Sequence, residues 1–290
     1  MVPPPLAAPG LSRSPFRPAS RWVLKDNAMN LSYIIKVAVH QLWRTVRHPS
    51  RSKLLLDPNA RRLLWLQFAG VRDDFKAVDD QGRLRRREYD SYAAYIEHQK
   101  SKLEILKRGE GYGYDGTDLQ KYDAEFRSHL RDRLRHLDFV RPGASVLCLA
   151  ARLGTEVKAF IDCGCFAVGV DLNAGHNNPY VLYGDFHHLV FADASIDVVY
   201  TNSIDHAYSL ELLCAEIVRV LKPRGYLVAE IQLGERESGR SNAGRWESLV
   251  WDSAAAVIAG LSTCALQVVS TSQFAEPWPG VALVAQKRGP

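Results

Sequence analysis

The hydrophobic pattern of the chain changes at Arg141, and this change limits the folds it can adopt. After Pro142-Gly143, apolar runs of strand length alternate with segments of helical periodicity. Such alternation is typical of an α/β protein. Strands are predicted at 145–149, 166–170, 181–183, 197–201, 226–231, 265–271 and 281–286, and helices near 155–162, 208–221 and 246–260.

The last two predicted strands are joined by a short Pro/Gly-containing loop, EPWPG. This loop leaves no room for a crossover helix, so the two strands must pair antiparallel. We therefore expect a mostly parallel seven-stranded sheet with an antiparallel last strand, over residues 141–290.

The preceding region, residues 29–140, is expected to be a helical cap that shapes a substrate site. Apolar residues recur at helical spacing over 30–48, 89–107 and 119–137. Residues 72–88 are polar and are expected to form a loop, and no strand is predicted before Val140.

Charge divides the chain at the same place. Residues 1–140 carry 26 Lys/Arg against 17 Asp/Glu, whereas residues 141–290 carry 11 against 15. The basic cap suggests an anionic small-molecule or glycan acceptor, and no nucleic-acid partner is favoured. The basic amphipathic helix over 30–48 fits either packing on the main domain or contact with a membrane surface.

The first 28 residues are expected to be a disordered extension, because six of the fourteen prolines fall in the first 25 residues without apolar periodicity. A transit peptide, or translation starting at Met29, are the alternatives. No apolar run approaches the length of a membrane span, and the five cysteines are scattered. The first feature argues against a transmembrane protein, and the scattered cysteines favour a reducing cytoplasm.

Candidate ligand-binding residues follow the first three predicted strands, since a parallel sheet binds ligands at the carboxyl ends of its strands. Small residues turn the chain into a helix after the first strand, at Ala150, Ala151 and Gly154. Asp171, 17 residues after Gly154, can accept both hydroxyls of a ribose; the alternative is a capping role. Asp185 and Phe186 can hold an adenine, so together these residues indicate a nucleoside pocket.

The fourth strand leads into Asn202, and a helix then leads to the turn LKP-x-G. With VLCLAARLGTEV, GVDLN, GDFHHLVFADASIDVVYTNSIDHA and EIVRVLKPRGYLV in this order, residues 141–290 resemble a class I S-adenosylmethionine-dependent methyltransferase of the small-molecule, methyltransferase-11-like type. The resemblance implies a Rossmann-like, doubly wound sheet and S-adenosyl-L-methionine as cofactor.

The resemblance also assigns roles to individual residues. It implies that the methionine part of the cofactor lies beside the first loop, the ribose on the strand-two tip, the adenine after strand three, and the methyl donor near strand four. The residues concerned are Ala150, Ala151, Arg152, Gly154, Asp171, Leu172, Asn173, Asp185, Phe186 and Asn202. The chain departs from the family at Cys148, where an acidic residue is usual, and at Ala150 and Arg152, where glycines are usual.

A base is needed only if the acceptor is a hydroxyl or a protonated nitrogen. His206, next to Asp205 after the fourth strand, is the hypothetical base; anchoring of the loop is the alternative. No metal is expected, because His187 and His188 are adjacent and lie far in sequence from Cys163-x-Cys165.

The sequence therefore predicts S-adenosylmethionine-dependent methyl transfer to a small molecule or glycan, on oxygen. Two alternatives remain. The altered first loop also fits a catalytically inactive binding module that kept the fold, and Asp171 alone also fits an NAD-dependent oxidoreductase.

Overall fold

A computed structural model describes residues 75–107, 116–175, 177–239, 241–244 and 246–289. The predicted extension over 1–28 and the predicted amphipathic helix over 30–48 lie outside these residues. No helix in the described ranges is both long and apolar enough to cross a membrane.

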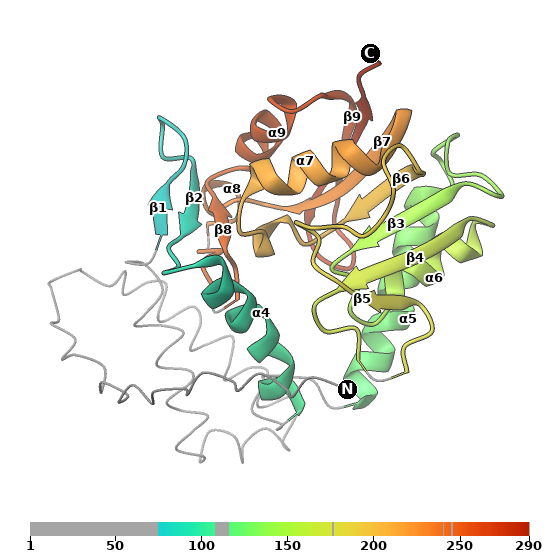
Figure 1. Cartoon of the computed structure of the whole chain (residues 1–290), viewed down its shortest axis with the longest axis horizontal. Helices are drawn as coiled ribbons and strands as arrows, with labels where there is room; N and C mark the ends of the chain where they lie inside the picture. The colour runs from blue at the N-terminus through green and yellow to red at the C-terminus, as the bar shows by residue number, and fades with distance from the viewer. Residues whose placement is uncertain (1–74, 108–115, 176, 240, 245, 290) are drawn as a thin grey trace, which may run out of the picture. The chain divides into compact units, whose positions relative to one another are not determined.

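A seven-stranded sheet forms the centre of the described structure, with strand order β5-β4-β3-β6-β7-β10-β9 (Figure 1). Strands β5, β4, β3, β6 and β7 are parallel, and β10 runs antiparallel to both β7 and β9. The predicted mostly parallel sheet with an antiparallel last strand is confirmed. The strands are β3 (Ser145–Leu149), β4 (Phe166–Asp171), β5 (Val181–Tyr183), β6 (Ile196–Thr201), β7 (Leu221–Gln232), β9 (Leu266–Phe274) and β10 (Gly280–Lys287).

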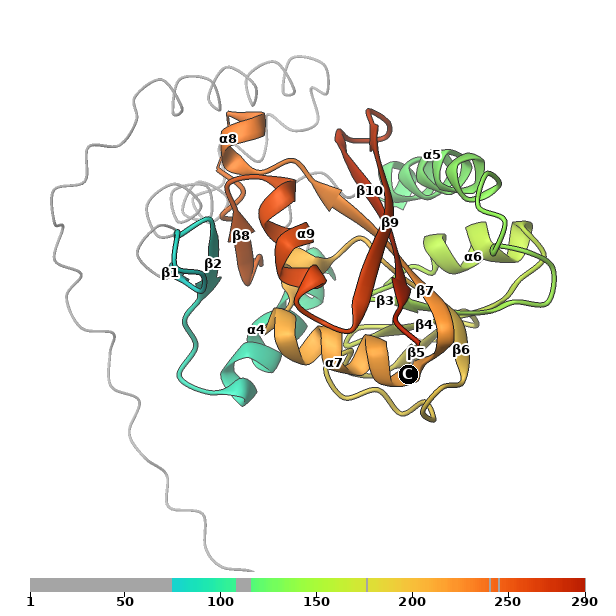
Figure 2. The same cartoon turned by 90° about the horizontal axis from the view of Figure 1, so that it is seen from above.

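Helices cover both faces of this sheet, as expected for central strands whose residues on both faces are mostly apolar and buried. In β3, Val146 and Cys148 belong to the core shared with α5 (Gly116–Leu134) and α6 (Thr155–Asp162). Leu147 and Leu149 belong to the core on the other face, shared with α7 (Leu210–Val220) and α9 (Ala254–Ser262). Figure 2 shows these two helical layers on opposite sides of the sheet.

The expectation of no strand before Val140 is wrong, and so is the expectation of a loop over 72–88. A second, three-stranded sheet has the order β1-β2-β8, with β1 (Phe75–Ala77) and β2 (Leu84–Arg87) as an antiparallel hairpin. Its arginines have specific partners: Arg85 forms an ion pair with Glu235, and Arg87 donates to the carbonyls of Gly244 and Glu247. The run of arginines in β2 lacks the alternation of apolar and polar residues that would predict a strand, because its partners lie far along the chain.

The helix predicted over 246–260 is also only partly right. Leu249–Trp251 forms β8, which pairs with β2, and α9 begins at Ala254. All three residues of β8 are buried, and so short an apolar run fits a strand or a helix equally well. The short helix α8 (Glu235–Ser238) precedes β8.

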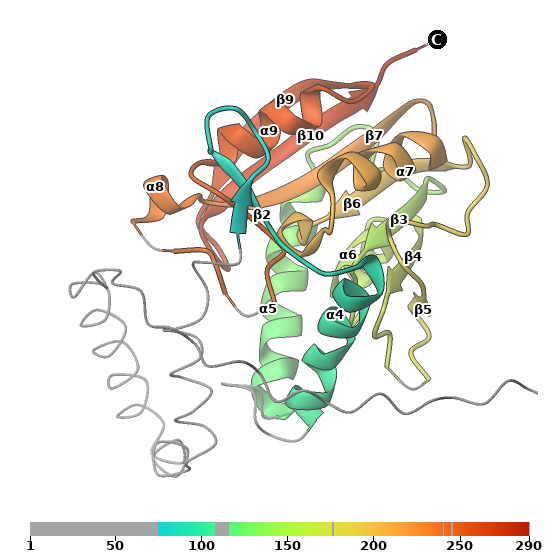
Figure 3. The ribbon, with the colours of Figure 1, turned by 60° about the vertical axis from the view of Figure 1, so that its left-hand side comes forward.

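Helix α4 (Tyr92–Lys107) lies next to β3, β4 and β5 (Figure 3). Its contacts with the main domain come from one face, because Tyr92, Tyr95, Gln99 and Lys102 recur at helical spacing. Helix α4 thus brings side chains from outside the predicted methyltransferase region to the edge where the strands end.

Candidate functional site

The candidate site lies where the parallel strands end, side by side. Leu149 of β3 is opposite Val170 of β4 on one side and Thr201 of β6 on the other. Asp171, at the end of β4, is in turn opposite Tyr183 of β5. The loops that follow these strands therefore meet at one edge, as predicted from their order in the sequence.

The loop after β3 keeps a left-handed backbone although two of the usual glycines are absent. Ala150, Arg152 and Gly154 have φ angles of 54°, 22° and 75°. A left-handed conformation costs a residue with a Cβ roughly 1–2 kcal/mol. The loop therefore has a strained shape that the surrounding structure maintains, which is frequent at functional sites.

Asp171 connects this loop to α4. Its Oδ2 accepts a hydrogen bond from the backbone N–H of Arg152 at 3.0 Å, and its Oδ1 accepts one from the backbone N–H of Asn173 at 2.6 Å. The Asn173 amide donates to the carbonyls of Gln99 and Lys100 of α4, at 3.4 and 3.3 Å. Each carboxylate oxygen of Asp171 has a second lone pair that can accept a ligand hydroxyl. Leu172 lies between the two residues.

Asp185 follows β5 and is already hydrogen-bonded. The Tyr92 hydroxyl of α4 donates to Oδ2, and the backbone N–H of His187 donates to Oδ1 at 2.9 Å. Burial acts to raise the pKa of Asp185, but the hydrogen bonds from His187 and Tyr92 outweigh burial and lower it. Phe186 beside it is buried, with its ring 4.6 Å from that of His187.

Asn202, after β6, contacts a carboxylate to which the sequence analysis assigned no role. Its side-chain Nδ2 donates to Oε1 of Glu156 at 3.2 Å, and the Ser203 hydroxyl donates to the side-chain Oδ1 of Asn202 at 2.9 Å. Glu156 lies in the first turn of α6, and only 8 % of its surface is exposed. Burial raises the pKa of Glu156 to about 7. A buried carboxylate in a ligand-binding loop is a candidate functional group.

His206 lies in the 3-10 turn Ile204–His206 and faces Lys102 more closely than Asp205. Its Nδ1 donates to the Trp246 carbonyl at 3.0 Å, which leaves the lone pair on Nε2. Lys102 Nζ lies 3.0 Å from Nε2, whereas Asp205 Oδ2 is 4.0 Å away.

The titration of this group follows from its burial. Burial, with the charge of Lys102, lowers the pKa of His206 to about 4, so the imidazole is neutral at neutral pH. Burial raises the pKa of Asp205 to about 6, and its Oδ2 accepts a hydrogen bond from Gln232 at 3.1 Å. Burial and then Arg152 lower the pKa of Lys102. Lys102 was not among the predicted site residues, because it reaches this edge only through the position of α4.

A cluster of aromatic side chains borders the site. Tyr92 and Tyr95 of α4 lie against Tyr208 with ring centroids 5.1 and 5.3 Å apart, and Tyr95 donates to the His206 carbonyl at 3.0 Å. His187 completes the cluster, 5.8 Å from Tyr92. These rings form an aromatic wall next to Asp185 and His206.

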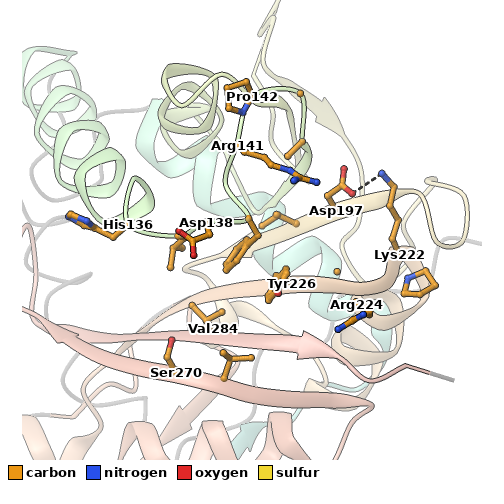
Figure 4. Close-up of a pocket in the computed structure, with 18 residues that line it drawn as sticks. His136, Asp138, Arg141, Pro142, Asp197, Lys222, Arg224, Tyr226, Ser270 and Val284 are labelled. Carbon is orange, nitrogen blue, oxygen red and sulfur yellow. Dashed lines mark hydrogen bonds and ion pairs between the residues drawn. The ribbon is translucent and has the colours of Figure 1, made fainter.

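A separate hollow of about 1020 Å³ lies at the opposite edge, where the strands begin (Figure 4). It contains the ion pair of Lys222 with Asp197, at 2.8 Å, and the flat stack of Phe139 on Tyr226 at 3.8 Å. None of the predicted site residues lines this hollow. Among the described residues, no cluster of three or more His, Cys, Asp or Glu could hold a metal ion.

Comparisons with known proteins match the part of the chain that contains these residues. Residues 147–229 match the family model described as a methyltransferase domain. The sterol 24-C-methyltransferase erg6 of Schizosaccharomyces pombe is 28% identical in an alignment 222 residues long, gaps included, that covers 60% of this chain and 58% of that protein. The sterol 24-C-methyltransferase ERG6B of Gibberella zeae is 24% identical in an alignment 228 residues long, gaps included, that covers 72% of this chain and 59% of that protein.

The chain thus spans less than two thirds of the length of these curated relatives. Among solved structures, the 1,6-didemethyltoxoflavin-N1-methyltransferase of Burkholderia thailandensis, with 1,6-didemethyltoxoflavin and S-adenosylhomocysteine bound, has a TM-score of 0.52. It is 16% identical and covers 74% of this chain and 99% of that protein. At this identity the likeness concerns the fold.

Proposed function

Because this chain contains a class I S-adenosylmethionine-dependent methyltransferase domain, we propose that it transfers a methyl group from that cofactor to an oxygen of a small molecule or glycan. One arrangement carries the proposal. Asp171 ends β4 beside the left-handed loop Ala150–Gly154, and Asp185 follows the neighbouring strand β5. Nucleoside ligands of α/β sheets bind at such an edge.

The residues present fit this cofactor. The free lone pairs of Asp171 suit two ribose hydroxyls, and Asp185 with the buried ring of Phe186 suits an adenine amino group and base. The backbone of Ala150 and Arg152 keeps the left-handed angles that glycines would adopt. When bound, S-adenosylmethionine supplies a methyl group on a positively charged sulfur, which is already activated as a leaving group.

The chain's own contribution is then to position the acceptor and take up its proton. We assign proton uptake to Nε2 of His206, which passes the proton on to solvent because the Lys102 ammonium, 3.0 Å away, opposes a lasting imidazolium. The Nε2 lone pair of His206 is free of a proton at neutral pH. Tyr92, Tyr95 and Tyr208 form the wall against which an acceptor packs and which keeps water from the reacting atoms.

The cations at this edge favour an anionic acceptor. Lys102 lies at the site itself, and Arg86 of β2 lies over the ring of Tyr208, 5.5 Å from its centroid. A carboxylate or phosphate on the acceptor is attracted by such charges, and the attraction weakens as salt screens it. We therefore expect the Michaelis constant for the acceptor to rise with ionic strength.

The test uses the full chain with methyl-labelled S-adenosylmethionine and a panel of sugars and phenols, each with and without a phosphate or carboxylate. We expect label in an anionic acceptor as an alkali-stable O-methyl ether, with a Michaelis constant that rises between about 50 and 300 mM salt. Label on carbon or nitrogen would overturn the oxygen assignment, and a salt-independent Michaelis constant would overturn the anionic one. Cofactor binding without transfer to any acceptor would favour an inactive binding module.

A further inference from the structure

Glu156 is a buried carboxylate that has no cation partner in the described part of the chain. It accepts hydrogen bonds from the Asn202 amide at 3.2 Å and from its own backbone N–H. Lys158, two residues further along α6, forms its ion pair with Asp123, and Arg152 is close enough only to lower the pKa of Glu156 in part. A carboxylate buried in this way is costly unless a positive charge accompanies it.

Glu156 lies near a position in β3 at which this chain lacks a carboxylate. The family usually has an acidic residue there, whereas this chain has Cys148, which is fully buried. Glu156 lies close enough to Cys148 to raise the pKa of its thiol, after the larger effect of burial. Side chains in the first turn of a helix lean toward its N-terminus, so α6 directs this carboxylate back toward the loop Ala150–Gly154.

We propose that Glu156 binds the α-ammonium group of the cofactor's methionine part, in place of the acidic residue that β3 lacks. The proposal rests on the proposed function and assigns one contact within that site. Asn202 orients the Glu156 carboxylate, and Ser203 orients Asn202 through the hydrogen bond to its carbonyl oxygen. An ammonium ion supplies the positive charge that the buried carboxylate lacks.

The other charges around Glu156 do not provide this partner. Arg152 of the loop acts to lower the pKa of Glu156, whereas Asp171 of β4 acts to raise it. Cys148 of β3 and Tyr200 of β6 also face it, and burial keeps both of them neutral with raised pKa values. With a pKa of about 7, Glu156 is about half protonated at pH 7 before the ligand binds.

Binding of an ammonium to Glu156 must therefore release a proton. Calorimetric titration of the unmodified chain with S-adenosylhomocysteine, in buffers of different ionisation enthalpy, measures the number released. We expect about half a proton per ligand at pH 7, falling toward zero at pH 8. The probe 5′-methylthioadenosine lacks the amino-acid part and should release none.

A pair of variants tests the same contact without relying on pH. Glu156→Gln keeps the shape and the hydrogen bond from Asn202, and we expect it to weaken S-adenosylhomocysteine about 10- to 100-fold. Its affinity for 5′-methylthioadenosine should change less than about twofold, as should both affinities in the exposed control Glu125→Gln. Adding Cys148→Asp to Glu156→Gln should restore S-adenosylhomocysteine binding at least in part, with thermal unfolding reporting whether each variant folds.

The outcomes separate the two proposals. If the unmodified chain binds both ligands but releases no proton, and Glu156→Gln weakens neither, Glu156 is a structural acid and the inference is wrong. If the unmodified chain binds neither ligand, the proposed cofactor site itself is wrong. Selective loss of S-adenosylhomocysteine together with loss of proton release supports the inference.

Discussion

Lys102 and His206 show how burial and one neighbouring charge set the state of a titratable side chain. The imidazole donates from Nδ1 to a carbonyl and accepts at Nε2 from the lysine, so its tautomer is fixed by two contacts. Burial is the larger cause of its low pKa and the positive charge of Lys102 is the second. A protonated His206 would lie against another cation, which its environment opposes.

Removal of the Lys102 charge should therefore raise the pKa of His206. We expect Lys102→Met to move it up from about 4, while burial still keeps it below about 6.5, the value of an exposed histidine. Titration of the His206 ring signals by NMR measures this shift. Lys100→Met is the control, because the Lys100 ammonium lies over the Tyr183 ring instead, 5.5 Å from its centroid. An unchanged His206 pKa in Lys102→Met would contradict the pairing.

The pH dependence of stability follows from the same residue. The unfolded state binds a proton at His206 near pH 6.5, whereas the folded state does not until about pH 4. The unfolded state is therefore favoured as the pH falls between these values. In Lys102→Met the gap between the two pKa values narrows, so this acid-induced loss should shrink.

Residues at strand tips could be predicted from the sequence, whereas residues that act across the fold could not. Asp171, Asp185 and Asn202 follow apolar runs at regular spacing, and the structure brings them to one edge. Glu156 and Lys102 carry no such signal. One is buried only because of the packing of α6, and the other reaches the edge only because α4 lies there.

At the scale of elements, α5 is joined to β7 through a buried ion pair. Arg133 donates to Oε1 of Glu230 at 2.6 Å, and the Tyr200 hydroxyl donates to Oε2 at 2.9 Å. The Arg133 guanidinium also lies 4.4 Å from the ring centroid of Phe274 in β9. Burial acts to raise the pKa of Glu230, against the effect of Arg133. Removing one partner of such a pair leaves an uncompensated buried charge.

We therefore expect Arg133→Met to lower the free energy of unfolding by about 3 kcal/mol. Without the arginine the folded-state pKa of Glu230 rises further above its unfolded value, so the loss should be larger at pH 8 than at pH 5. Urea titration at the two pH values measures this difference. The exposed control Arg135→Met should change stability by less than about 0.5 kcal/mol.

The double variant Arg133→Met/Glu230→Gln separates charge from packing. If the uncompensated carboxylate causes the loss, the added Glu230→Gln should recover part of it and remove the difference between pH 8 and pH 5. A loss equal in both variants and independent of pH would contradict an electrostatic cause.

The limits of sequence-based prediction also appear at this scale. The strands of the main sheet were predicted because each is a local apolar run, and β3 and β5 have the predicted bounds. The sheet β1-β2-β8 was missed because β1 and β2 are short and polar and their partner β8 lies far along the chain. Their pairing depends on contacts such as that of Arg85 with Glu235, which no local pattern reveals.

At the scale of the whole molecule, the two edges of the sheet differ in chemistry. The carboxyl edge carries Asp171, Asp185 and Glu156 beside a strained loop, and α4 covers it with tyrosines and Lys102. The amino edge carries the open hollow with the Lys222–Asp197 pair. The central claim is that the cofactor binds at the carboxyl edge.

Calorimetric binding of S-adenosylhomocysteine to the unmodified chain, to Asp171→Ala and to Arg224→Ala tests this claim directly. Arg224 lines the hollow at the amino edge and controls for an unspecific effect of losing a charge. We expect the unmodified chain and Arg224→Ala to bind within about twofold of one another, and Asp171→Ala to bind at least about tenfold more weakly. Absence of binding to the unmodified chain, or equal binding by Asp171→Ala, would contradict the account.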